Sequence, residues 1–262
     1  MKMNKKALLA VSFGTSYEET RKNTIEAIEE DLKAAYPDRT FYRAWTSAFI
    51  RKKIRERDGY IVPSVSEALD GILCDGSDDL LIQPILMLAG GEFRKIMKEV
   101  SVYTDRFRKI RIGRPIIGYK EDIPEMVSLL SGLFKETAEK QMMAFMGHGS
   151  GDAGFSVYEM MNAGFEEAGL SNFCVGTVEY EPGITPVLDK TDELRPEVVY
   201  LTPFLIVCGD HANNDMAGDQ EDSWKTLIAE KGPAVKCIMK GLGEYEEVRA
   251  LFVKRSKEAA DL

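Results

Sequence analysis

Short apolar runs alternate along the chain with longer segments in which apolar residues recur every three or four positions. The short runs are typical of buried strands, whereas the longer spacing is typical of helices with one buried face. The expected strands are residues 6–12, 39–45, 78–88, 108–113, 141–146, 172–178, 197–207 and 234–239. The expected helices are residues 16–36, 64–74, 92–107, 121–139, 153–168, 220–231 and 244–260. This alternation predicts an α/β fold with mainly parallel sheets flanked by helices.

Two strand-and-loop segments of the first half reappear in the second half. Residues 83–92 match residues 202–211 in their pattern of Pro, apolar and Gly positions, and residues 11–15 match residues 146–150. Either a duplication or convergence of two short patterns explains such an echo. A duplication predicts two similar lobes with a cleft between them. We place the lobes at residues 1–125 and 126–262.

Composition narrows the range of partners. Of 262 residues, 44% are hydrophobic and 29% are charged, and the formal net charge is −9. No apolar run approaches the ~20 residues that cross a bilayer, and the apolar stretch near the amino terminus is too short for a signal peptide. An acidic chain also lacks the basic footprint of a nucleic-acid surface. We expect a cytoplasmic protein with neither a membrane nor a nucleic acid as partner.

One basic segment departs from this acidic balance, because residues 51–57 carry five Lys or Arg residues. A solvated helix face is the ordinary explanation of such a run. The alternative is a local positive wall for a polyanionic small molecule, to which Arg43 could contribute.

Several familiar chemistries have no motif in this chain. Neither a G-x-G-x-x-G at a strand end nor a P-loop is present, Ser150 lies outside a G-x-S-x-G elbow, and the acidic residues 210–222 miss the EF-hand spacing. The cysteines are too far apart for a zinc knuckle, so we expect them to be reduced and buried. They are Cys74, Cys174, Cys208 and Cys237.

The chain has only two histidines, and each follows an apolar run that predicts a strand. His148 lies between two glycines, and His211 ends the segment Gly209-Asp210-His211. Open α/β sheets bind ligands at the carboxyl ends of their strands. Histidine is the commonest metal ligand and is suited to proton transfer near neutral pH. A pair of unrelated polar loop residues is the alternative interpretation.

Two glutamates occupy comparable positions at strand ends. Glu179 follows the expected strand 172–178, and Glu92 takes the place of His211 in the echo. Mixed nitrogen and carboxylate ligands suit Co²⁺, Fe²⁺, Ni²⁺ or Zn²⁺ better than Mg²⁺. For Glu179 a helix cap or an exposed loop charge would also explain the position.

With these motifs the chain resembles the anaerobic sirohydrochlorin cobaltochelatases, which are related in fold to ferrochelatases. The resemblance covers nearly the whole chain and is most specific at Gly209-Asp210-His211. The matching segments are residues 7–17, 43–47, 146–149, 176–179, 209–217, 222–225 and 241–244. The chain departs from the family at Glu179-Tyr180-Glu181-Pro182, where Glu-Ser/Gly-Tyr-Pro is more common, and at Leu86, where some relatives carry histidine.

The resemblance implies both an activity and a set of site residues. It implies a metal-inserting lyase that places Co²⁺ in sirohydrochlorin, or in a close precorrin, during anaerobic cobalamin biosynthesis, without an organic cofactor. It implies that His148, Glu179 and His211 bind the metal, and we count Glu92, which would line the same cleft, as a fourth candidate metal ligand. Either His148 or His211 would accept a proton from a pyrrole nitrogen as the metal enters. Apolar contacts to the tetrapyrrole would come from Phe13, Gly14, Thr15, Met87 and Leu88.

The same residues are compatible with other functions. A non-catalytic carrier of a tetrapyrrole or metal needs the same ligands, and an iron chelatase for sirohaem or haem would differ only in its ion. A periplasmic solute-binding protein fits less well, since we find no signal peptide. Fe²⁺, Ni²⁺ and Zn²⁺ therefore stay open beside Co²⁺, and a homo-oligomer is compatible with the sequence.

Overall fold

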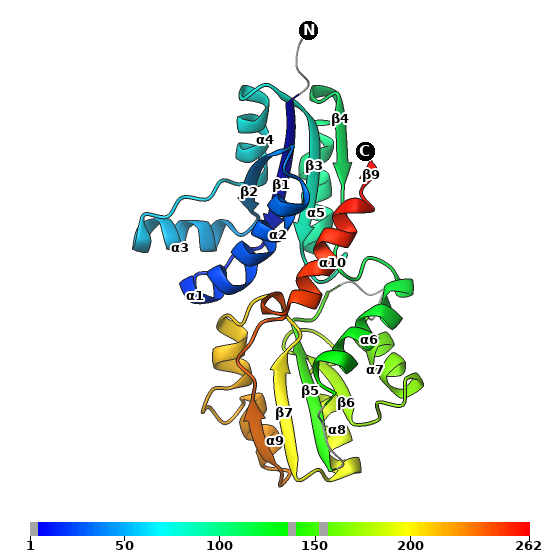
Figure 1. Ribbon diagram of the computed structural model, residues 1–262. Helices are drawn as coiled ribbons and strands as arrows, with labels where there is room; N and C mark the ends of the chain where they lie inside the picture. The colour runs from blue at the N-terminus through cyan, green and yellow to red at the C-terminus, as the bar shows by residue number, and fades with distance from the viewer. Residues whose placement is uncertain (1–4, 136–139, 152–156) are drawn as a thin grey trace. The chain divides into compact units, whose positions relative to one another are not determined.

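The computed structural model describes residues 5–135, 140–151 and 157–262. The chain divides into two compact units, each built around a mainly parallel sheet (Figure 1). Unit 1 comprises Met1–Gly118 and Gly243–Leu262, and unit 2 comprises Tyr119–Leu242. The α/β fold predicted from the alternating pattern is confirmed. In the described part of the chain, no helix has the length and apolar content needed to cross a membrane.

The sheet of unit 1 has the strand order β2-β1-β3-β4-β9. Its strands are β1 (Lys5–Ser12), β2 (Thr40–Trp45), β3 (Ser77–Ile85), β4 (Lys109–Ile112) and β9 (Ala260–Asp261). All neighbours pair in parallel except β9, which is antiparallel to β4. The parallel pairs require crossover connections, and helices supply them.

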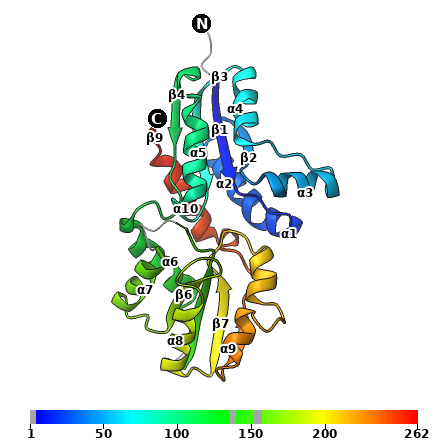
Figure 2. The same cartoon turned by 180° about the vertical axis from the view of Figure 1, so that it is seen from behind.

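Helices cover both faces of this sheet (Figures 1 and 2). On one face, α4 (Val65–Cys74) and α5 (Gly91–Ser101) share a core with the side chains of Leu9 and Val11. On the other face lie α2 (Ala27–Ala35) and α10 (Glu246–Lys257). The remaining helical elements of unit 1 are α1 (Glu18–Arg21), the π turn η1 (Lys22–Glu26), α3 (Ala48–Asp58) and the 3₁₀ turns η2 (Thr104–Arg106) and η5 (Leu242–Glu244), the last beginning at the unit boundary.

The sheet of unit 2 has the strand order β6-β5-β7-β8, all parallel. Its strands are β5 (Gln141–Gly147), β6 (Phe173–Thr177), β7 (Val198–Pro203) and β8 (Ala234–Cys237). One face packs on α6 (Ile123–Leu133) and α7 (Val157–Glu167) through a cluster of phenylalanines around Phe145. The other face packs on α8 (Thr185–Leu194), the π turn η4 (Ala212–Met216) and α9 (Trp224–Ala229). A 3₁₀ turn, η3 (Lys120–Asp122), precedes α6.

The echo between the two halves is a structural repeat. The orders β2-β1-β3-β4 and β6-β5-β7-β8 are equivalent, position by position. Val11 pairs with Pro84 in the first sheet, and Met146 pairs with Pro203 in the second. One sequence match aligns Val11 with Met146, and the other aligns Pro84 with Pro203. The structure brings both matches into one repeat, although the two are separated by different numbers of residues along the chain. The loops after the strands are therefore comparable between the units, which favours duplication over convergence.

The carboxy-terminal residues 243–262 belong to unit 1, which differs from the predicted division into lobes. We assigned residues 126–262 to one lobe, but α10 packs on α2 and β3 of unit 1. Val248 and Phe252 of α10 are fully buried there, and the guanidinium of Arg255 donates to the carbonyl oxygen of Ile116 (3.1 Å). The apolar pattern of this helix predicts that one face is buried, but it does not indicate which sheet that face covers.

Several local predictions also differ from the structure. The helix expected at residues 16–36 is divided into α1, η1 and α2, the strands expected at 78–88 and 197–207 end at Ile85 and Pro203, and α8 was not predicted. Residues 136–139 and 153–156, at the ends of two expected helices, lie outside the described residues. Cys174 and Cys208 are buried as expected, Cys237 is partly buried, and Cys74 is exposed.

Candidate metal centre

Three of the four predicted metal ligands lie together in unit 2. His148 follows β5, Glu179 follows β6, and His211 precedes η4 in the connection after β7. These three strands are neighbours in the order β6-β5-β7, so their carboxyl ends lie at one edge of the sheet. One candidate ligand atom from each residue lies within 4.8 Å of the other two.

The geometry of the three side chains suits a first-row divalent ion. Nε2 of His148 lies 3.8 Å from Oε2 of Glu179, and Nε2 of His211 lies 3.9 Å from Oε1. The two imidazole rings are nearly perpendicular, with centroids 5.1 Å apart. Three ligand atoms that lie within 4.8 Å of one another are at most about 2.8 Å from a common centre, somewhat more than the ~2.0–2.2 Å of zinc-like bonds to nitrogen and oxygen. Small shifts of these side chains would complete a three-ligand site.

The three side chains are partly exposed to solvent. The side chains of His148 and Glu179 are 48% and 47% exposed, and that of His211 is 31% exposed. A structural zinc site uses four protein ligands and is closed, whereas catalytic sites keep a position open for water or substrate. Three partly exposed ligands therefore correspond to the open kind of site.

Main-chain contacts hold the His148 and Glu179 loops together. The N–H of Glu179 donates to the carbonyl oxygen of His148, and the N–H of Val178 donates to that of Gly147, both at 2.8 Å. Gly149 has φ +98°, and a Cβ at this position would lie 1.7 Å from the carbonyl oxygen of Glu179. Only glycine combines this conformation with such a close approach.

Tyr158 supports the same loop from α7. Its hydroxyl accepts a hydrogen bond from the N–H of Gly149 (3.0 Å), and its ring lies where a Cβ of Gly147 would project. Burial raises the pKa of Tyr158 to about 12, so the phenol stays neutral. We did not predict this residue, and the two glycines beside His148 were the available signal for a side chain packed against the loop.

Asp215 is a second contact that the sequence reasoning missed. Its Oδ2 lies 2.8 Å from Nδ1 of His211, on the opposite side of the ring from Glu179. The four-residue spacing between His211 and Asp215 was the available signal.

The other predicted site residues belong to unit 1. Phe13, Gly14 and Thr15 follow β1, while Met87, Leu88 and Glu92 follow β3, at the equivalent edge of that sheet. Phe13 is 46% exposed, whereas Gly14 packs against the ring of Trp45. Glu92 is the second residue of α5 and is partly exposed. That these residues line a cleft shared with unit 2 stays a prediction.

The basic residues of unit 1 are largely engaged by its own carboxylates. Arg51 contacts Glu67 at 3.2 Å, and Arg43 pairs with the buried Glu29. Burial outweighs the attraction of Arg43 and raises the pKa of Glu29 to about 7. Arg43 and Arg51 are therefore poorer candidates for contacting a polyanion than the sequence suggested, whereas Lys52, with its longer 3.9 Å contact to Glu56, is 67% exposed.

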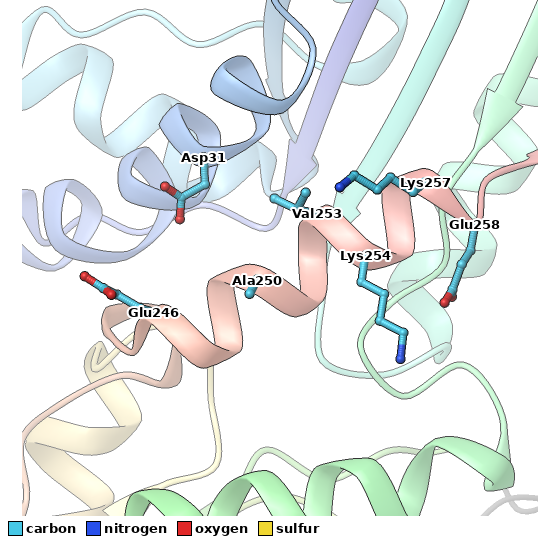
Figure 3. Close-up of a pocket in the computed structure, with 7 residues that line it drawn as sticks. All are labelled: Asp31, Glu246, Ala250, Val253, Lys254, Lys257 and Glu258. Carbon is cyan, nitrogen blue, oxygen red and sulfur yellow. The ribbon is translucent and has the colours of Figure 1, made fainter.

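A pocket with a volume of about 560 Å³ lies on the surface of unit 1, and residues of α2 and α10 line it. Figure 3 shows these residues. Asp31 and Glu246 lie toward one end, Lys254 and Lys257 lie toward the other, and Ala250 and Val253 are between them. Its lining contains both signs of charge and none of the predicted metal ligands, so we do not assign it to the candidate metal centre.

Comparisons of the sequence with known proteins give a consistent result. Residues 6–261 match the protein family described as Cobalt chelatase (CbiK). The chain is 36% identical over 258 residues to the sirohydrochlorin cobaltochelatase of Salmonella typhimurium, covering 98% of this chain and 97% of the relative. It is 25% identical over 247 residues to the sirohydrochlorin cobaltochelatase CbiKC of Nitratidesulfovibrio vulgaris, covering 93% and 86%.

Solved structures resemble the chain in fold. SirB from Bacillus subtilis with Fe³⁺ matches with a TM-score of 0.65 at 14% identity, over 97% of this chain and 95% of that protein. CbiX, titled the terminal enzyme for biosynthesis of siroheme in denitrifying bacteria, matches with a TM-score of 0.53 at 18% identity, over 97% and 99%. Both likenesses support the predicted fold.

Proposed function

The chain belongs to the cobalt chelatase family, and on this basis we propose that it inserts Co²⁺ into sirohydrochlorin. It is thus a metal-inserting lyase of cobalamin biosynthesis, with Co²⁺ as a substrate. The observation that carries the proposal is the convergence of His148, Glu179 and His211 at one edge of a parallel sheet. The N/O donor set of these residues suits cobalt.

The three side chains supply what metal insertion requires. Insertion forms bonds from Co²⁺ to the pyrrolic nitrogens, removes two N–H protons and displaces the ion's water molecules. In the proposal, two imidazoles and one carboxylate hold a partly dehydrated ion and leave positions free for the macrocycle. As pyrrole nitrogens replace the imidazoles on the ion, each of the two imidazoles can accept one of the two protons and pass it to water. Glu179 contributes one negative charge, which helps to retain the dication.

Visible absorbance tests the proposal directly. We expect the chain to convert sirohydrochlorin to its cobalt complex faster than the spontaneous reaction. His148→Ala and His211→Ala should each lower the rate by about 10²–10⁴-fold while circular dichroism shows an unchanged fold. Glu179→Gln should weaken Co²⁺ binding, because it removes an anionic ligand without changing its shape. Asp219→Ala serves as a matched control, since this carboxylate is 98% exposed and contacts Lys225.

Two results would contradict the proposal. One is a folded variant that lacks both histidines and inserts Co²⁺ at the normal rate. The other is binding of Co²⁺ or the tetrapyrrole without turnover, which would favour the carrier function. Competition among Co²⁺, Fe²⁺, Ni²⁺ and Zn²⁺ in the same assay identifies the preferred ion. The cytoplasmic location, the homo-oligomer and the contribution of Glu92 stay predictions.

A further inference from the structure

Each ring nitrogen of His211 lies near a carboxylate. Nδ1 lies 2.8 Å from Oδ2 of Asp215, a hydrogen-bond distance, while Nε2 lies 3.9 Å from Oε1 of Glu179. An ionised carboxylate only accepts hydrogen bonds, so the ring nitrogen bonded to Asp215 must carry a proton. In a neutral ring, the other nitrogen then presents its lone pair.

The local fold explains how Asp215 reaches this position. His211 precedes the π turn η4, in which the N–H of Ala217 donates to the carbonyl oxygen of Ala212 (3.2 Å), five residues earlier. Ala212 and Met216 are fully buried and fix the turn in the core of unit 2. Asp215, four residues after His211, is thereby held on the same side of the turn as the histidine.

The second histidine lacks an equivalent contact in the described residues. Nδ1 of His148 lies 3.4 Å from the carbonyl oxygen of the adjacent Gly149, a long contact to a neutral acceptor. The two imidazoles are therefore held differently before any metal binds. His211 is oriented by a charged partner in a packed turn, and His148 is oriented mainly by its loop.

From this asymmetry we propose that Asp215 is a positioning residue, which holds the proton of His211 on Nδ1 and directs the Nε2 lone pair toward the metal. The inference rests on the proposed function for the identity of the ion, but the tautomer is a property of the metal-free chain. Outer contacts of this kind typically change metal affinity or activity by about 10–100-fold. We expect a loss of that size when Asp215 is removed.

The histidine content of the chain gives a direct measurement. Only two histidines are present, so an untagged protein labelled with ¹⁵N-histidine gives the signals of two rings. The neutral His211 ring should show a protonated Nδ1 and an unprotonated Nε2. Asp215→Ala should remove this preference at His211 and leave the tautomer of His148 unchanged. His148 thus provides an internal control for damage to the fold.

Co²⁺ titration of the chain without tetrapyrrole gives the second readout. Asp215→Ala should weaken binding by about 10–100-fold and should raise KM for Co²⁺ more than it lowers kcat. Asp215→Asn should recover part of the affinity, because its amide oxygen can still accept the hydrogen bond. Asp219→Ala removes the same charge from the same segment, and it should bind Co²⁺ like the unmodified chain.

Two outcomes would overturn the inference. An unchanged His211 tautomer in Asp215→Ala would show that other contacts fix the ring. An equal loss of affinity in Asp219→Ala would assign the effect to overall charge. Failure of the proposed function is distinguishable, since the unmodified chain would then show the His211 tautomer but would not insert Co²⁺.

Discussion

Replacing Gly149 with alanine tests how the chain holds two metal ligands together. The new Cβ would lie 1.7 Å from the carbonyl oxygen of Glu179 and 2.7 Å from its carbonyl carbon. These are main-chain atoms, so no side-chain rotation can relieve the contact. The loops carrying His148 and Glu179 would have to separate by about 1.5–2 Å to restore ordinary van der Waals distances.

The structure gives the size of the effect. An alanine at φ +98° costs about 1–2 kcal/mol relative to glycine. Separating the loops also breaks the hydrogen bond from the N–H of Glu179 to His148, with a net value of about 1 kcal/mol. We therefore expect a loss of about 2–3 kcal/mol in the free energy of unfolding. The 3.8 Å spacing between Nε2 of His148 and Oε2 of Glu179 should also widen. Co²⁺ affinity should then fall by at least about tenfold, comparable to losing a supporting contact.

Chemical denaturation and Co²⁺ titration measure the two effects. Gly169→Ala is the matched control, because Gly169 also has a positive φ, +73°, but no atom lies within 4 Å of its Cβ position. It should lose only the conformational part, about 1–2 kcal/mol, and should retain Co²⁺ binding. The reasoning would be refuted if Gly149→Ala were as stable as Gly169→Ala and bound Co²⁺ normally. The close approach of the two loops would then not be needed to hold the ligands together.

Three further predictions concern unit 1 and the Glu179 loop. Glu29 has a pKa of about 7 in the folded protein against a reference value of 4.5, so the folded state retains a proton that the unfolded state loses. The free energy of unfolding should therefore fall as the pH rises from 4.5 to 7. In chemical denaturation at several pH values, this fall should be smaller by up to about 3 kcal/mol in Glu29→Gln than in the unmodified chain, and an equal fall in both would refute the assignment. Tyr180 has φ +61°, so Tyr180→Gly should be about 1 kcal/mol more stable than Tyr180→Ala by thermal unfolding, whereas equal stability would show no relief of strain. Reversing the exposed Lys52 and Lys53 to glutamate should raise KM for the tetrapyrrole several-fold at low ionic strength and less at high salt, and an unchanged KM at low salt would leave α3 as a solvated helix face.

The sequence predicted the positions of those site residues whose location is determined by the course of the main chain. His148, Glu179 and His211 each follow a predicted strand, and parallel strands bring their carboxyl ends to one edge of a sheet. The repeat was also visible in the sequence, because Pro84 and Pro203 lie at equivalent points of buried strands. The pairings of Val11 with Pro84 and of Met146 with Pro203 then followed from the shared strand order.

The sequence did not predict contacts that depend on how side chains or whole helices pack. Tyr158 and Asp215 contact the candidate metal centre through particular rotamers and a π turn, and neither feature has a periodic signal. Helix α10 has a recognisable apolar face, yet two similar sheets were available to receive it. Its place in unit 1 depends on a fit to α2 and β3 that no local pattern encodes.

The arrangement of the units along the chain bears on how the protein forms during synthesis. Unit 2 is one uninterrupted stretch, Tyr119–Leu242, whereas unit 1 needs Gly243–Leu262 in addition to its first 118 residues. Domains generally fold as units while the ribosome extends the chain from its amino terminus. The unit that carries His148, Glu179 and His211 is therefore complete in sequence before α10 is translated. The amino-terminal unit begins before unit 2 and is completed after it, because the apolar face that α10 covers stays uncovered until residues 243–262 have been synthesised.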